Sequence, residues 1–127
     1  EVPLVFDETV RPYYSNYLYD WFLESSSKFG WQQINNVDEL QQKVNRNGGV
    51  GIISAKRFIL NKSGHIVVVV PETESEKAYR ENGKVIYPLQ SQAGYDNYNY
   101  FSEQRRDWWA NKDPEKGYSA AIFYYHD

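Results

Sequence analysis

Residues 63–71 read Ser-Gly-His-Ile-Val-Val-Val-Val-Pro (SGHIVVVVP), and this stretch decides the fold class. Its β-branched run is bounded by Gly64 and Pro71, which predicts a strand over residues 64–70. Residues 49–55 (GVGIISA) have the same character. Short, continuous apolar runs of this kind are typical of strands that are covered on both faces. We therefore predict that both segments are central strands of one sheet.

Two helical patterns precede these strands. An apolar stripe at the spacing of helical turns predicts a helix over residues 15–29, with Ser15 as its N-cap. Asn36 and Glu39 have the spacing of a capping box, and apolar residues at positions 37, 40 and 44 predict a second, short helix behind it. Asn47-Gly48 is expected to end that helix, because both residues tolerate the left-handed conformation.

Strand and turn signals continue downstream. Asn82-Gly83 predicts a tight turn into a strand over residues 84–91, with Pro88 at an edge or bulge. We expect a loop over residues 92–100, a helical turn over 101–109 and a last strand over 118–125. Two helices followed by an antiparallel sheet of about four to six strands indicate the α+β class.

Length and composition exclude several classes. The 127 residues suffice for one domain, which we expect to span residues 1–127. A net charge of −3 argues against nucleic acid as a partner, and the longest apolar run is too short to span a membrane. The chain has no Cys, which excludes disulfides and thiolate metal cages. It also has no Met, so we expect a processed product or one truncated at its N-terminus.

His65 is the first candidate for a functional residue. It opens a very apolar strand directly after Gly64, and an imidazole at the mouth of a rigid strand is well placed to reach a cleft. The alternative is a structural histidine that bonds to a neighbouring backbone group.

A wider set of motifs surrounds His65, and together they resemble the papain-like bacterial cell-wall amidases and peptidases of the NlpC/P60 and CHAP type. The motifs are Gly30-Trp31, Leu40-Gln41-Gln42 with Asn45, residues 48–53, residues 63–71 and Gln90-Ser91-Gln92-Ala93-Gly94. The resemblance implies a papain-like fold and hydrolysis of amide bonds in peptidoglycan peptides. It implies a cysteine at the start of a helix, His65 as the base, and Gln92 as the group that orients the imidazole. It also implies a secreted or periplasmic protein.

The chain departs from this family in one respect: it lacks the cysteine nucleophile. Three explanations are open. The cysteine lies on an upstream segment or a second chain; Ser15 takes its place; or the domain is an inactive relative that binds a wall peptide, a glycan or a protein partner without chemistry. Without a thiolate, a histidine base has no nucleophile to activate.

Aromatic residues supply candidates for ligand binding. Tyr95 and Tyr98 alternate with Asp and Asn in residues 92–100, a pattern found in carbohydrate and peptide clefts. Trp31 is a third substrate-binding candidate, whereas Trp108 and Trp109 are expected to pack in the core. We expect no cofactor and no metal, because His126 and Asp127 lie too far along the chain from His65 to form a ligand motif. The expected partner is a peptidoglycan-derived peptide or glycan.

Overall fold

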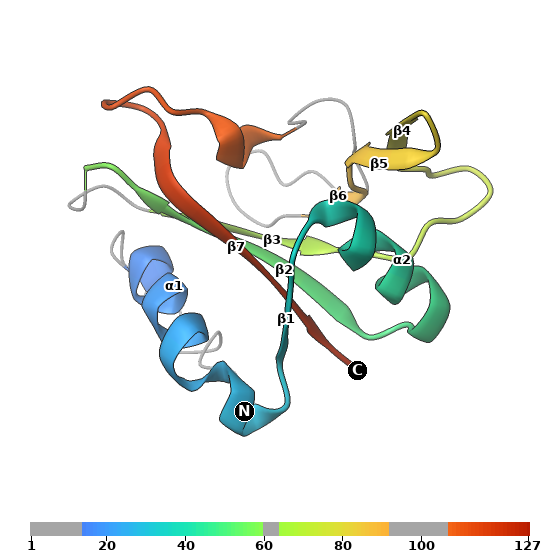
Figure 1. Cartoon of the computed structure of the whole chain (residues 1–127), viewed down its shortest axis with the longest axis horizontal. Coiled ribbons are helices and arrows are strands. Elements are labelled where there is room, and N and C mark those ends of the chain that lie inside the picture. Colours follow the sequence, from blue (N-terminus) through green and yellow to red (C-terminus); the bar gives the residue numbers. More distant parts are fainter. Residues whose placement is uncertain (1–13, 60–63, 92–106) are drawn as a thin grey trace.

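The computed structural model describes residues 14–59, 64–91 and 107–127. Within these ranges the chain is an α+β domain whose main sheet has five antiparallel strands in the order β1-β7-β2-β3-β6 (Figure 1). The strands are β1 (Gln32–Ile34), β2 (Val50–Arg57), β3 (His65–Val69), β6 (Gln90–Ser91) and β7 (Tyr118–His126). A separate hairpin pairs β4 (Tyr79–Glu81) with β5 (Lys84–Tyr87). The helices are α1 (Tyr14–Ser25), α2 (Val37–Asn47) and two short 3-10 helices, η1 (Ser26–Phe29) and η2 (Trp108–Ala110).

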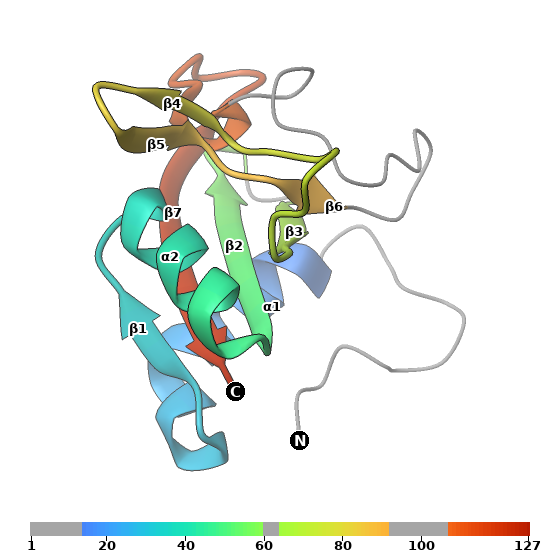
Figure 2. The same ribbon diagram turned by 90° about the vertical axis from the view of Figure 1, so that its right-hand side faces the viewer.

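The sheet lies between the two α-helices, and each face has its own apolar cluster (Figure 2). Side chains alternate along a strand, so Ile52 packs with Phe22 on the α1 face and Ile53 packs with Leu40 on the α2 face. All four side chains are at most 1% exposed. Central strands covered on both faces account for the continuous Val and Ile runs, and the prediction for both segments is confirmed.

Helix α2 begins as its sequence predicted. The backbone N–H of Glu39 donates to Asn36 Oδ1 at 2.9 Å, and Asn36 Nδ2 donates to Glu39 Oε1 at 3.2 Å. The helix ends at Asn47, followed by Gly48 and Gly49, both with positive φ. Helix α1 differs slightly from expectation: it begins at Tyr14, so Ser15 is its second residue and not its N-cap.

The predicted strand over residues 84–91 was wrong as a single element. Pro88 has no N–H to donate, and the strand is interrupted there. The first half, β5, turns back on β4 through Asn82 and Gly83, whose φ angles of 53° and 80° fit the predicted tight turn. The second half, β6, joins β3 in the main sheet. The sequence pattern also missed β1 and β4, which have only three residues each.

Helix α2 carries buried polar groups that hold the chain on either side of the hairpin. Gln41 is fully buried; its Oε1 accepts from the Leu89 N–H at 2.8 Å, and its Nε2 donates to the Val70 carbonyl at 2.9 Å. One turn earlier, Asp38 Oδ1 accepts from the Val85 N–H at 2.8 Å. These bonds set the position of β6 beside β3, and therefore the surroundings of His65.

Candidate functional site

His65 is the first residue of β3, and strand alternation fixes the face to which it belongs. It is paired with Ala55 on β2, and it follows the same alternation as Val67 and Val69, which pack against α2. Its half-buried ring meets the indole of Trp108 edge to face, with ring centroids 4.7 Å apart and an interplanar angle of 79°. The histidine at the strand mouth therefore contacts η2, an element far along the chain.

Trp108 connects His65 to a buried amide. Its Nε1 donates to Gln90 Oε1 at 2.8 Å, and Gln90 is 0% exposed. The Gln90 Nε2 donates to the carbonyl of Pro88 at 3.3 Å, which fixes the orientation of the amide. A buried indole N–H needs an acceptor, and here the acceptor comes from the strand next to β3.

Further rings pack beside Trp108, and one of them, Tyr118, is buried. Trp109 and Tyr118 meet Trp108 edge to face at 5.6 Å and 5.1 Å, and the guanidinium of Arg57 lies 4.8 Å from the centre of the Tyr118 ring. We call His65, Trp108, Trp109 and Tyr118 the aromatic edge. Its two tryptophans are half-buried, so their rings both pack on the core and reach the surface.

Helix α1, which carries Ser15, lies on the other face of the sheet. Tyr19 and Phe22 of α1 pack with Ile52, and Lys56 Nζ on β2 forms an ion pair with Asp20 at 2.9 Å. His65 belongs to the opposite, α2 face. For residues 14–16 the structure describes the backbone only, so the Ser15 hydroxyl lies outside the described part.

The remaining predicted site residues are distributed as follows. Gln92, Tyr95 and Tyr98 lie outside the described residues. Trp31 is 7% exposed and packs on Phe22, at 5.1 Å between ring centroids, within the α1-side cluster. This places it in the core on the face opposite His65, and its buried Nε1 has no hydrogen-bond partner in the described ranges.

His126 is not near His65. Its Nε2 lies 2.9 Å from the Phe29 carbonyl and its Nδ1 lies 2.7 Å from the Asp127 carbonyl, at the other end of β7. Within residues 14–59, 64–91 and 107–127, no group of three or more His, Asp or Glu side chains is placed to hold a metal ion. No helix among the described residues is long and apolar enough to cross a membrane.

Sequence reasoning missed the parts of this site that depend on tertiary structure. Trp108 packs against the core as expected, but its ring contact with His65 was not predicted. Gln90, which was noted only as part of a motif, supplies the buried amide. One signal in the sequence could have indicated Gln90. It is a polar residue that directly follows Pro88-Leu89 where the strand resumes, and a polar side chain buried there needs hydrogen-bond partners.

No protein-family model matches the chain, and neither a curated protein nor a solved structure resembles it closely enough to carry a comparison.

Proposed function

We propose that this chain is a binding module that holds a cell-wall-derived peptide along the aromatic edge without cleaving it. The observation that carries the proposal is the array of His65, Trp108 and Gln90, in which a buried amide fixes the indole and the indole supports the imidazole. Rings held in one orientation offer apolar contact area at a low cost in conformational entropy. The half-buried rings of Trp108 and Trp109 are suited to apolar contact with the side chains of a peptide.

The ligand class comes from the sequence resemblance to NlpC/P60 and CHAP domains, whose substrates are peptidoglycan peptides. With this ligand class we also propose a secreted or periplasmic setting for the protein. The resemblance is the reason for proposing this ligand class. Because the chain has no cysteine, it lacks the thiolate nucleophile with which that family cleaves amide bonds.

The position of α1 also favours binding over hydrolysis. A nucleophile must lie within hydrogen-bond reach of its base, and the helix with Ser15 packs on the face of the sheet opposite His65. A hydrolase would need a nucleophile from another segment or another chain. The binding module needs only the groups of the aromatic edge.

Titration with purified muropeptides tests the proposal. We expect saturable quenching of tryptophan fluorescence and shifts of the backbone amide signals of β3 and η2, while mass spectrometry shows that the muropeptides remain intact. Trp108→Phe keeps an aromatic ring but removes the donor to Gln90, and we expect it to weaken binding about fivefold to tenfold. Trp21→Phe is the matched control, because Trp21 is a half-buried indole on the α1 face.

Three results would contradict the proposed activity, the ligand class or the site. Cleavage of the muropeptides would establish a hydrolase and overturn the binding module. Binding of glycan fragments without the peptide would overturn the ligand class. An equal loss of muropeptide affinity in Trp108→Phe and Trp21→Phe would show that the aromatic edge is not the binding site.

A further inference from the structure

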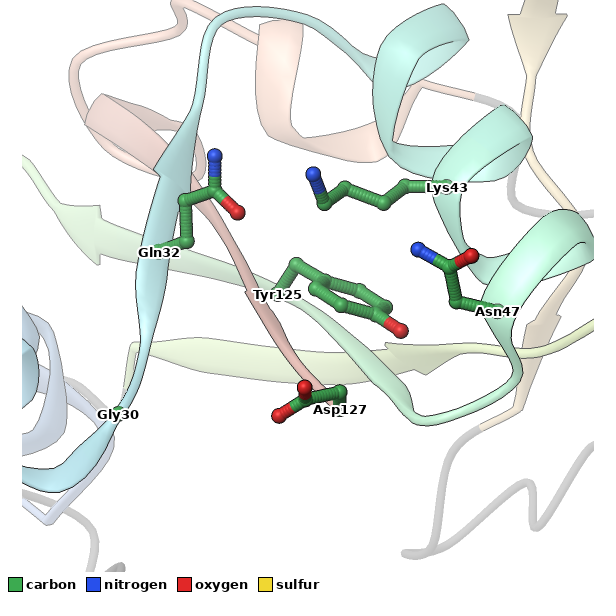
Figure 3. Close-up of a pocket in the computed structure, with 6 residues that line it drawn as sticks. All are labelled: Gly30, Gln32, Lys43, Asn47, Tyr125 and Asp127. Atoms are coloured by element: carbon green, nitrogen blue, oxygen red, sulfur yellow. The ribbon is translucent and has the colours of Figure 1, made fainter.

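A pocket lies at the far end of β7, away from the aromatic edge. It has a volume of about 440 Å³, is open to solvent, and lies between β1, the last turns of α2 and the end of β7 (Figure 3). Its lining residues are Gly30, Gln32, Lys43, Asn47, Tyr125 and Asp127. We call it the Lys43 pocket.

Three polar side chains line this pocket: Lys43 is half-buried, and Gln32 and Asn47 are exposed at its rim. Gln32 comes from β1, and Lys43 and Asn47 come from successive turns of α2, with the ammonium of Lys43 directed toward the amide of Gln32 (Figure 3). Within the described part of the chain, none of the three side chains forms a hydrogen bond, and no carboxylate lies within 4.0 Å of Lys43 Nζ. Among the described residues, the Lys43 ammonium therefore forms no ion pair within 4.0 Å, and two carboxamides and Asp127 line the same pocket.

The floor of the pocket is the ring of Tyr125. Lys43 Nζ lies 5.7 Å from the ring centre, and the tyrosine hydroxyl donates to the Gly48 carbonyl at 2.9 Å. Tyr125 is 4% exposed, because its ring belongs to the apolar cluster that includes Leu40 of α2 and Ile53 of β2. Anchoring at both the ring and the hydroxyl means that the floor is already formed without a ligand.

Gly30 and Gly49 allow the chain segments around the pocket to pack closely against His126. A Cβ on Gly30 would lie 3.0 Å from His126 Nε2, and one on Gly49 would lie 2.4 Å from the His126 carbonyl oxygen. His126 is itself held by the carbonyl of Phe29, at 2.9 Å from its Nε2. The start of β1, the α2–β2 turn and the end of β7 are thereby locked together around the pocket.

We propose that the Lys43 pocket binds the C-terminal carboxylate of a short peptide. The ammonium of Lys43 supplies a charge-assisted hydrogen bond to the carboxylate. The carboxamides of Gln32 and Asn47 each offer a donor and an acceptor, which matches a peptide group. Asp127 lies on the other side of the Tyr125 ring from Lys43, and its negative charge repels a dianion such as phosphate more strongly than a singly charged carboxylate (Figure 3). The proposal uses no residue of the aromatic edge and is independent of the proposed function.

Backbone amide shifts in the ¹⁵N-labelled chain provide the test. The probes are N-acetyl-Ala-Ala, its uncharged C-terminal amide, and inorganic phosphate. We expect N-acetyl-Ala-Ala to shift the signals of residues 43–49 and 124–126 in a saturable manner, and the amide to bind about tenfold more weakly. Phosphate should bind more weakly than N-acetyl-Ala-Ala.

Two lysine variants test whether the peptide binds in the Lys43 pocket. Lys43→Gln should weaken N-acetyl-Ala-Ala about tenfold, while Lys77→Gln, which removes an exposed lysine elsewhere, should have no effect. An unchanged amide spectrum outside the pocket verifies that Lys43→Gln is folded. Equal binding of the amide, tighter binding of phosphate, an unchanged affinity of Lys43→Gln, or no saturable shift would each overturn the proposal. Trp108→Phe should leave the binding of N-acetyl-Ala-Ala intact. Failure of this proposal can therefore be distinguished from failure of the proposed function at the aromatic edge.

Discussion

Arg80 binds Glu72 through two parallel hydrogen bonds, from Nη1 to Oε2 at 2.8 Å and from Nη2 to Oε1 at 2.6 Å. The carboxylate also accepts from Asn45 Nδ2 at 2.7 Å and from the Ala78 N–H at 2.8 Å. The side chain of Glu72 is 8% exposed. One carboxylate thus joins α2 to the β4–β5 hairpin. The hydrogen bonds from Arg80 are the main cause that lowers the pKa of Glu72 from 4.5 to about 2.

This ion pair predicts a pH-dependent stability. The pKa of Glu72 is lower in the folded state than in the unfolded state, so its stabilisation is complete above about pH 4.5 and is lost as the pH falls toward about 2. The full shift corresponds to about 3 kcal/mol. Since Arg80 is partly open to solvent, we expect about 1–2 kcal/mol.

Urea unfolding of the wild type and of Glu72→Gln at a series of pH values measures the effect. The difference in the free energy of unfolding should be largest at pH 7 and should shrink by pH 2. Glu74→Gln, at an exposed glutamate in the same loop, should follow the wild type. A difference that stays constant with pH would contradict the assignment.

Gln41 predicts a large and local loss of stability. Gln41→Leu would leave the buried N–H of Leu89 and the carbonyl of Val70 without their side-chain partners, which should cost about 2–4 kcal/mol. The neighbouring Gln42 is exposed and bonds only to Asp38 on its own helix, so Gln42→Leu should change stability by less than about 0.5 kcal/mol. Thermal unfolding of the two variants makes the comparison; similar melting temperatures would show that Gln41 is not an anchor.

Alanine substitutions at two glycines with similar φ angles distinguish the stability cost of backbone strain from that of a steric clash. Gly49 has φ 76° and Gly83 has φ 80°, but a Cβ at Gly49 meets the His126 carbonyl at 2.4 Å, whereas one at Gly83 has nothing within 4 Å. Gly83→Ala should cost about 1–2 kcal/mol from the left-handed backbone alone. Gly49→Ala should cost at least about 2 kcal/mol more, as seen by chemical denaturation. Equal losses would mean that the turn can move away from β7 at little cost.

The capping box of α2 gives a prediction of moderate size. Asn36→Ala removes the acceptor for the Glu39 N–H and should lower the free energy of unfolding by about 1 kcal/mol. Asn35→Ala, one residue earlier and also exposed, is the control with little expected effect. Denaturation curves that coincide for the two variants would show that Asn36 contributes nothing as a cap.

The fold class followed from the sequence because its strongest signals are local. The apolar runs of β2 and β3, the capping pair Asn36 and Glu39, and the Asn82-Gly83 turn each act within a few residues, and each is found in the structure. The short strands β1 and β4 carry no period long enough to recognise. The division of residues 84–91 between two sheets depends on Pro88 and on the partners of each half, which no local pattern contains.

The candidate site could be predicted only at His65. Its place at the strand mouth is a local property, but its contact with Trp108 depends on where η2 packs. The Lys43 pocket combines residues from β1, α2 and β7 that no local sequence pattern brings together. Which face of the sheet carries α1 is equally a tertiary property, and it decides whether a hydroxyl on that helix can serve His65.

The central place of β7 has a consequence for synthesis on the ribosome. Among the described strands β7 comes last in sequence, yet it lies between β1 and β2, and it pairs His126 with Val50. Until residue 126 has emerged, a nascent chain exposes the valine- and isoleucine-rich edge of β2, and β1 lacks its neighbour. Such an unpaired edge is a template for association between chains. Translation that stalls before β7 should therefore yield a chain that depends on chaperones or is degraded.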